Sequence, residues 1–86
     1  MNFLDFEIKG ARTGSVARVT LDGVESDVML MTESNVNAYK QGRRFEYFGG
    51  HYTASPAVIP IPHSGNWHVV VVPGAGGRVR ATLQVV

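Results

Sequence analysis

The densest group of side chains able to hold a ligand lies between positions 39 and 52, in "YKQGRRFEYFGGHY". Arginine pairs with phosphate and stacks on rings, and aromatic rings stack on bases, nicotinamide or sugars. We therefore predict a ligand site on one concave surface, formed by Arg43, Arg44, Tyr47, His51 and Tyr52. The alternative is that Phe45 and Tyr47 belong to the core, that Tyr39 anchors a helix, and that the charges are solvated.

The three histidines, His51, His63 and His68, could in principle bind a transition metal, because neutral imidazole is a good ligand for zinc, copper, nickel and iron. Their spacing matches no local metal-ligand motif. His63 lies in a turn, and strand alternation should point His68 away from Trp67. We therefore predict no metal site and no cofactor, and a histidine-based metalloenzyme ranks last among the functions considered.

A nucleophilic site is also not expected. Ser64 adjoins His63, but "HSG" has the composition of a tight turn, in which neighbouring side chains diverge. The "PGAGG" loop is followed by a strand, whereas a phosphate-binding loop leads into a helix whose N–H groups hold the anion. The carboxylates are scattered over loops and outward faces. These patterns predict a protein that is not an enzyme.

The composition limits the remaining function classes. The chain has 86 residues, no cysteine and a formal net charge of +1, and we expect one domain over residues 1–86. Disulfides and thiolate metal sites are excluded, and nucleic-acid binding is not expected because a dedicated binder is usually strongly basic. No stretch has the roughly 18 apolar residues of a membrane span, and no signal peptide is apparent. We expect a cytoplasmic protein without membrane contact.

Alternating apolar and polar residues predict the elements that must position these side chains. Such strands are expected at 3–9, 15–21, 27–32, 45–48, 51–54, 57–61, 67–72 and 78–86, with Pro60 marking an edge strand and Gly49-Gly50 a hairpin turn or bulge. Ser34 and Gly42 would cap one or two helical turns at residues 35–41. The pattern is typical of an all-β, jelly-roll-like sandwich of about seven or eight short antiparallel strands with one helical insert.

The inward residues of these strands define a predicted core. It comprises Phe6, Val19, Leu30, Ile59, Ile61, Trp67, Val69, Val71 and Leu83, with Trp67 between the two sheets. Met29 and Met31 face the other way, under a neighbouring loop or at an interface. Together with the apolar last strands they would supply the interface of a homo-oligomer.

Several blocks of the chain resemble a known family. The distinctive ones are "SNVNAYKQG", "YFGGHY" and "PHSGNWHVVV", and "SVARVTLDG" and "GGRVRATLQV" extend the similarity over nearly the whole chain. They resemble the bacterial domain-of-unknown-function family numbered 1883. The resemblance implies an all-β fold, found alone or joined to Toll/interleukin-receptor-like (TIR) domains, and a sensing or ligand-binding accessory role in bacterial defence. It supplies no functional residues to carry over.

These observations together favour a non-enzymatic binding module that recognises a nucleotide-like or sugar-like small molecule. The alternative is a structural or oligomerising domain whose partner is another protein or a second copy of the chain. A saturable ligand and a pocket would indicate the first function, and a stable oligomer without a pocket would indicate the second.

Overall fold

The computed structural model describes residues 3–86 and has seven strands and one helix in this range. The helix is α1 (Glu33–Lys40). The strands are β1 (Leu4–Ala11), β2 (Val16–Gly23), β3 (Ser26–Met31), β4 (Phe48–Tyr52), β5 (Ala57–Pro60), β6 (Gly65–Pro73) and β7 (Val79–Val85). The all-β sandwich predicted from the alternating pattern is confirmed.

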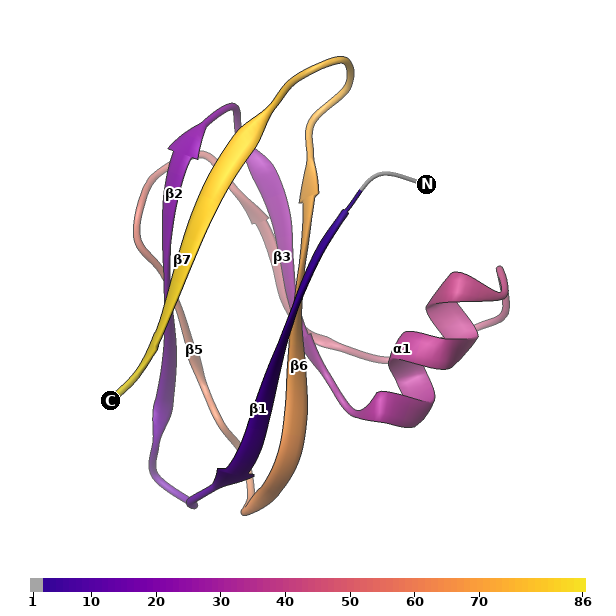
Figure 1. Cartoon of the computed structure of the whole chain (residues 1–86), viewed down its shortest axis with the longest axis vertical. Coiled ribbons are helices and arrows are strands. Elements are labelled where there is room, and N and C mark those ends of the chain that lie inside the picture. Colours follow the sequence, from indigo (N-terminus) through magenta and orange to yellow (C-terminus); the bar gives the residue numbers. More distant parts are fainter. Residues whose placement is uncertain (1–2) are drawn as a thin grey trace.

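The strands form two antiparallel sheets that pack face to face (Figure 1). One sheet has the order β1-β6-β3-β4 and the other has the order β5-β2-β7. The β3–β4 connection, which contains α1, stays within one sheet, whereas every other connection between successive strands crosses to the opposite sheet. A standard jelly roll has eight strands, so this sandwich is one strand shorter.

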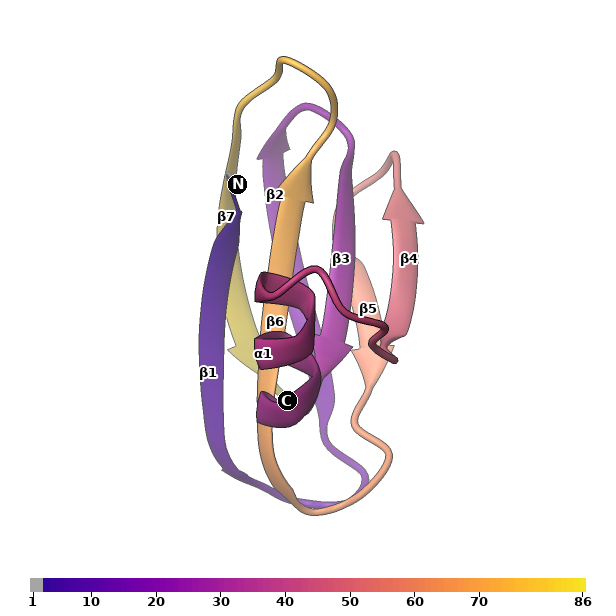
Figure 2. The ribbon, with the colours of Figure 1, turned by 90° about the vertical axis from the view of Figure 1, so that its right-hand side faces the viewer.

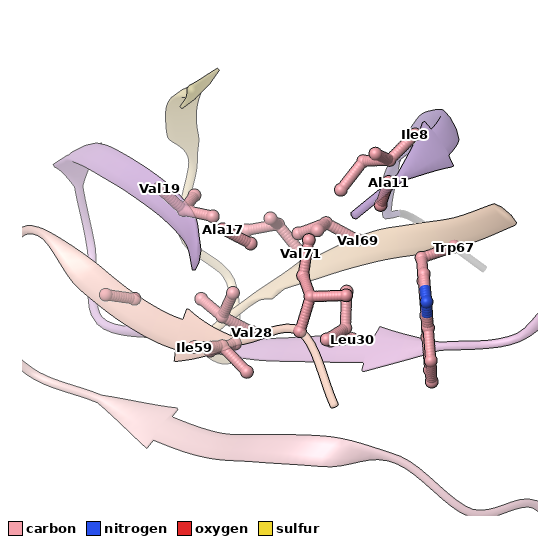
Figure 3. Packing of buried hydrophobic residues seen from close by; sticks show 12 residues of the cluster. Ile8, Ala11, Ala17, Val19, Val28, Leu30, Ile59, Trp67, Val69 and Val71 are labelled. Atoms are coloured by element: carbon pink, nitrogen blue, oxygen red, sulfur yellow. The ribbon is translucent and has the colours of Figure 1, made fainter. Parts of the chain in front are cut away.

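The main core lies between the two sheets (Figure 3). The clustered side chains are apolar, because each strand presents every second residue to the opposite sheet. The predicted core residues lie in this cluster, except Phe6 and Leu83, which are partly buried and pack against it. The cluster is formed by Ile8, Ala11, Ala17, Val19, Val28, Leu30, Ala57, Ile59, Ile61, Trp67, Val69 and Val71.

Strand β6 is covered on both faces, as its run of valines predicts. It lies between β1 and β3, with the second sheet on one side and α1 on the other (Figure 2). Under α1, a second cluster joins Met29 and Met31 of β3 to Val36 and Val70. The two methionines are therefore covered by the helix, close to the alternative that places them under a neighbouring loop, and they are not exposed for a homomeric interface.

Helix α1 begins earlier than predicted, because Thr32 rather than Ser34 is the residue before its first turn. It ends at Lys40, and Gly42 follows the cap residue Gln41, with a φ of 70° and an N–H that donates to the Tyr39 carbonyl. This left-handed conformation favours glycine. Within residues 3–86, no helix is long and apolar enough to cross a membrane.

Strand β4 contains the Gly49-Gly50 pair, which the sequence predicts as a hairpin turn or a bulge; it is neither, because both residues lie in a strand whose register with β3 is continuous. Both glycines pair with β3, at Met29 and Val28. Gly49 has a φ of 124°, and a Cβ atom there would collide with the Val28 carbonyl oxygen. The pair therefore allows β4, at the edge of the sheet, to approach β3 closely. The dipeptide alone does not show whether it has this role or forms a turn.

Candidate functional site

The five residues predicted to bind a ligand do not share one surface. Arg43 and Arg44 are exposed in the segment between α1 and β4. His51 lies on the outer face of β4, and its neighbour Tyr52 packs against the core between the sheets. Only Tyr47 reaches a sizeable groove. The prediction grouped these residues because they are close along the chain. Strand alternation, however, sends adjacent residues such as His51 and Tyr52 to opposite faces of the sheet.

The groove lies at the end of the four-stranded sheet, where β3 ends and β4 and β6 begin. Its volume is about 540 Å³, within the range of small-molecule sites. We call it the aromatic groove, since four aromatic rings and one imidazole contribute to its wall. It is lined by Leu30, Met31, Thr32, Asn35, Phe45, Glu46, Tyr47, Phe48, His63 and Trp67.

The aromatic rings in the groove support one another while leaving two of them accessible. Trp67 is 2% exposed, and its ring centroid lies 4.8 Å from that of His63 and 6.1 Å from that of Phe48. Its indole Nε1–H donates to the His63 carbonyl at 3.0 Å. Phe48 is 50% exposed and Tyr47 is 47% exposed. The groove thus has a fixed aromatic floor and two open aromatic side chains.

Polar contacts from α1 fix one wall of the groove. The Asn35 side chain donates from Nδ2 to the Thr32 hydroxyl at 3.0 Å and accepts the Glu46 N–H at 2.9 Å through Oδ1. These bonds tie the extended segment before β4 to the start of the helix. Glu46 itself lines the groove.

The three histidines lie apart, in three separate environments. His63 borders the aromatic groove, and its Nδ1 lies 3.1 Å from the Ser64 carbonyl oxygen. The Ser64 hydroxyl bonds with the Thr13 hydroxyl at 2.9 Å. His51 and His68 each pair through Nδ1 with an aspartate on a neighbouring strand. A shared three-histidine centre does not form among the residues that the structure describes.

The two histidine–aspartate pairs have equal lengths but different surroundings. His51 Nδ1 lies 2.8 Å from Asp27, and both side chains are about half exposed. His68 Nδ1 lies 2.8 Å from Asp5, and His68 as a residue is only 9% exposed. Glu7 and Glu33 also approach the His68 ring. Sequence reasoning did not find this group, although His68 is conspicuous as the polar residue in an apolar strand.

Comparison with known proteins adds the family and nothing about activity. No curated protein and no solved structure shows a significant match to the chain. The sequence does match, over residues 1–86, the family described as a domain of unknown function (DUF1883). The match therefore agrees with the resemblance carried by blocks such as "PHSGNWHVVV" and "YFGGHY". The chain is a member of the DUF1883 family.

Proposed function

We propose that this protein is a non-enzymatic binding module and that its ligand occupies the aromatic groove. The observation that carries the proposal is the pair of half-exposed rings, Tyr47 and Phe48, beside the fixed Trp67. Large apolar side chains are usually buried, and an exposed group of them beside a cavity marks a binding surface. The groove is open enough to admit one ring-sized ligand along these side chains.

The polar residues of the groove favour a neutral, hydroxyl-rich ligand such as a saccharide. Its lining holds one carboxylate, Glu46, together with the polar side chains of Thr32 and Asn35, and it contains no arginine or lysine. A carboxylate accepts hydrogen bonds from hydroxyl groups but repels a phosphate. Aromatic faces meanwhile pack against the apolar face of a sugar ring. A sugar therefore fits this lining better than a nucleotide does.

The test is a ligand titration monitored by tryptophan fluorescence, because Trp67 is the only tryptophan and it lines the groove. The panel contains methyl glycosides of glucose, galactose and mannose, N-acetylglucosamine, and ADP, ADP-ribose and NAD as the phosphate-bearing comparison. Saturable quenching or enhancement by one saccharide is the expected result. A response restricted to the phosphate compounds would replace the saccharide with a nucleotide as ligand.

Variants locate the binding to the groove. Tyr47→Ala and Phe48→Ala should each weaken binding roughly tenfold, which corresponds to about 1.4 kcal/mol. Val58→Ala is the matched control, since Val58 is also an exposed apolar side chain but lies on β5 and does not line the groove. Equal effects of all three substitutions, or none, would overturn the assignment of the groove.

Substitution of Glu46 separates the two ligand classes. Glu46→Gln should weaken binding of a saccharide, because the amide accepts hydroxyl hydrogen bonds less strongly than a carboxylate does. The same substitution should strengthen binding of a phosphate-bearing ligand by removing a like charge. The direction of the change in Kd therefore identifies the chemistry, independently of which compound in the panel binds best.

A further inference from the structure

A second site lies on the face of the four-stranded sheet that α1 partly covers. His68 is in the outward-facing row of β6, where the residues that follow it in this row, Val70 and Val72, are apolar. It pairs across the sheet with Glu7 on β1 and Met31 on β3. Its position in this apolar row restricts the contact of the ring with water, and its side chain is 11% exposed.

Only one of the two ring nitrogens of His68 has a hydrogen-bond partner among the described residues. Nδ1 lies 2.8 Å from Oδ1 of Asp5. An ionised carboxylate can only accept, so Nδ1 carries the hydrogen. Nε2 points the other way, with Glu33 at 3.9 Å and Glu7 at 4.0 Å, which is beyond hydrogen-bond distance. Both carboxylates thus converge on Nε2, which keeps contact with solvent, without hydrogen-bonding to it.

We infer that His68, Glu7 and Glu33 form a binding site for one divalent transition-metal ion. The three ligand atoms lie within 4.8 Å of one another. Donor atoms that share one ion tetrahedrally at about 2.0–2.2 Å lie roughly 3.3–3.6 Å apart. The two distances from Nε2, 3.9 and 4.0 Å, are only slightly longer, so an ion placed between the three groups needs only small side-chain movements.

The Asp5 carboxylate completes the arrangement of a metal-binding histidine. Histidine ligands commonly donate their other ring N–H to a carboxylate, which fixes the tautomer and makes the ligand nitrogen more basic. Asp5 is in turn 3.8 Å from the Lys40 ammonium, and Lys9 is 3.8 Å from Glu7. The three carboxylates exceed the two ammonium groups by one negative charge, so the group attracts a cation.

The donor set selects the class of metal. One imidazole and two carboxylates suit manganese, iron, cobalt, nickel or zinc in the divalent state, whereas Ca²⁺ and Mg²⁺ prefer oxygen ligands alone. Three protein ligands leave coordination positions for water or a bound molecule. The site is separate from the aromatic groove: Thr32, just before α1, lines the groove, and Glu33, in the first turn, faces His68.

The test is titration of the metal-free 86-residue protein with two metals. Binding of Co²⁺ is monitored by visible absorption, and binding of Zn²⁺ is measured by calorimetry. The expected result is one ion per chain and a cobalt spectrum of low coordination number. Glu33→Gln should weaken binding at least tenfold without affecting folding, because the Glu33 side chain is 73% exposed. Asp5→Asn should weaken it by roughly 10–100-fold, as losses of such supporting carboxylates do.

His51→Gln is the matched control. His51 has the same 2.8 Å contact of Nδ1 with an aspartate, but only Glu25, at 3.9 Å, approaches its Nε2. The His51 group therefore has the same histidine–aspartate pair but only one glutamate near Nε2. Metal affinity should be unchanged in His51→Gln. Loss of the bound ion in this variant, with retention in Glu33→Gln, would show surface binding at His51 and overturn the proposal.

Nitrogen NMR of the histidine rings distinguishes a metal site from a simple ion pair. We expect the His68 Nε2 signal to move on addition of Zn²⁺, while the Nδ1–H that bonds to Asp5 is retained. A His68 Nε2 signal that does not move at saturating Zn²⁺ would overturn the proposal. The carboxylates would then only form ion pairs around the ring.

Discussion

The two faces of the four-stranded sheet are built from the same strands but covered in different ways. On the inner face, the opposite sheet covers Leu30, Val69 and Val71 completely. On the outer face, one eight-residue helix covers Met31 and Val70. Around that helix lie the two histidine–aspartate pairs, on neighbouring strands of the same sheet.

The difference in cover determines where this small domain can place charged and polar side chains. A sheet packed on a sheet excludes water over a whole face, so a charged group there would be desolvated at high cost. A short helix buries only a stripe of the sheet beneath it. Charged side chains beside that stripe keep contact with water. The inner face therefore provides stability, and the outer face and the sheet end provide sites.

The largest expected effect comes from the inner face. Trp67→Ala should cost roughly 3–5 kcal/mol of unfolding free energy, because it removes the largest buried side chain and leaves a cavity. Total stabilities are about 5–15 kcal/mol, so the variant should be barely folded. Urea unfolding measures the loss. Trp67→Phe, which keeps an aromatic ring, should lose much less, and a loss below about 1 kcal/mol in Trp67→Ala would contradict tight inner packing.

A smaller effect is expected on the outer face. Met31→Ala removes a side chain that is as buried as the inner residues, at 1% exposure. We expect a loss of about 2 kcal/mol, at the low end for Met→Ala, because α1 can settle toward the sheet and partly fill the cavity. The same urea experiment measures it. A loss as large as that of Trp67→Ala would show that the helix packs as rigidly as the second sheet does.

The sequence predicts the inner face well and the rest of the architecture less well. Alternation in β2 and β7 reveals which residues face inward, since that pattern is a property of each strand alone. The pairing of strands across the sandwich is not local. Gly49-Gly50 shows the limit: the dipeptide permits both a turn and close strand approach, and only its position beside Val28 decides between them.

The candidate sites likewise depend on contacts between strands that are not local in the sequence. The aromatic groove combines residues from β3, α1, the segment before β4, β4 and β6, and Tyr47 is the one residue of the five predicted from the 39–52 cluster that lines it. The His68 group spans from Asp5 to His68, and it exists because β1 pairs with β6 in one register. A one-residue shift of that register would send Asp5 and Glu7 to the inner face. Such a site can be read only from the pairing.

The smallest expected effect concerns Tyr39, which lies on the outer face between Phe3 and Phe45 with ring centroids 5.3 and 5.0 Å away. Burial raises the pKa of the Tyr39 phenol above its ordinary value, and the negative charge of Asp27 raises it further. An unfolded tyrosine titrates near pH 10. Below that pH the neutral phenol is present in both states, and its contribution to stability is complete.

As pH rises from about 10 through the higher pKa of the folded protein, the unfolded chain releases its proton first, so unfolding becomes more favourable. Tyr39→Phe should therefore change stability by less than about 0.5 kcal/mol at neutral pH but flatten its decline above pH 10. Urea unfolding from pH 8 to 11.5 measures both slopes. Asp27→Asn, which removes only the second cause, should fall between them. Identical alkaline slopes in the wild type and Tyr39→Phe would mean that the phenol is solvated, and that the outer face is looser at α1 than its aromatic contacts indicate.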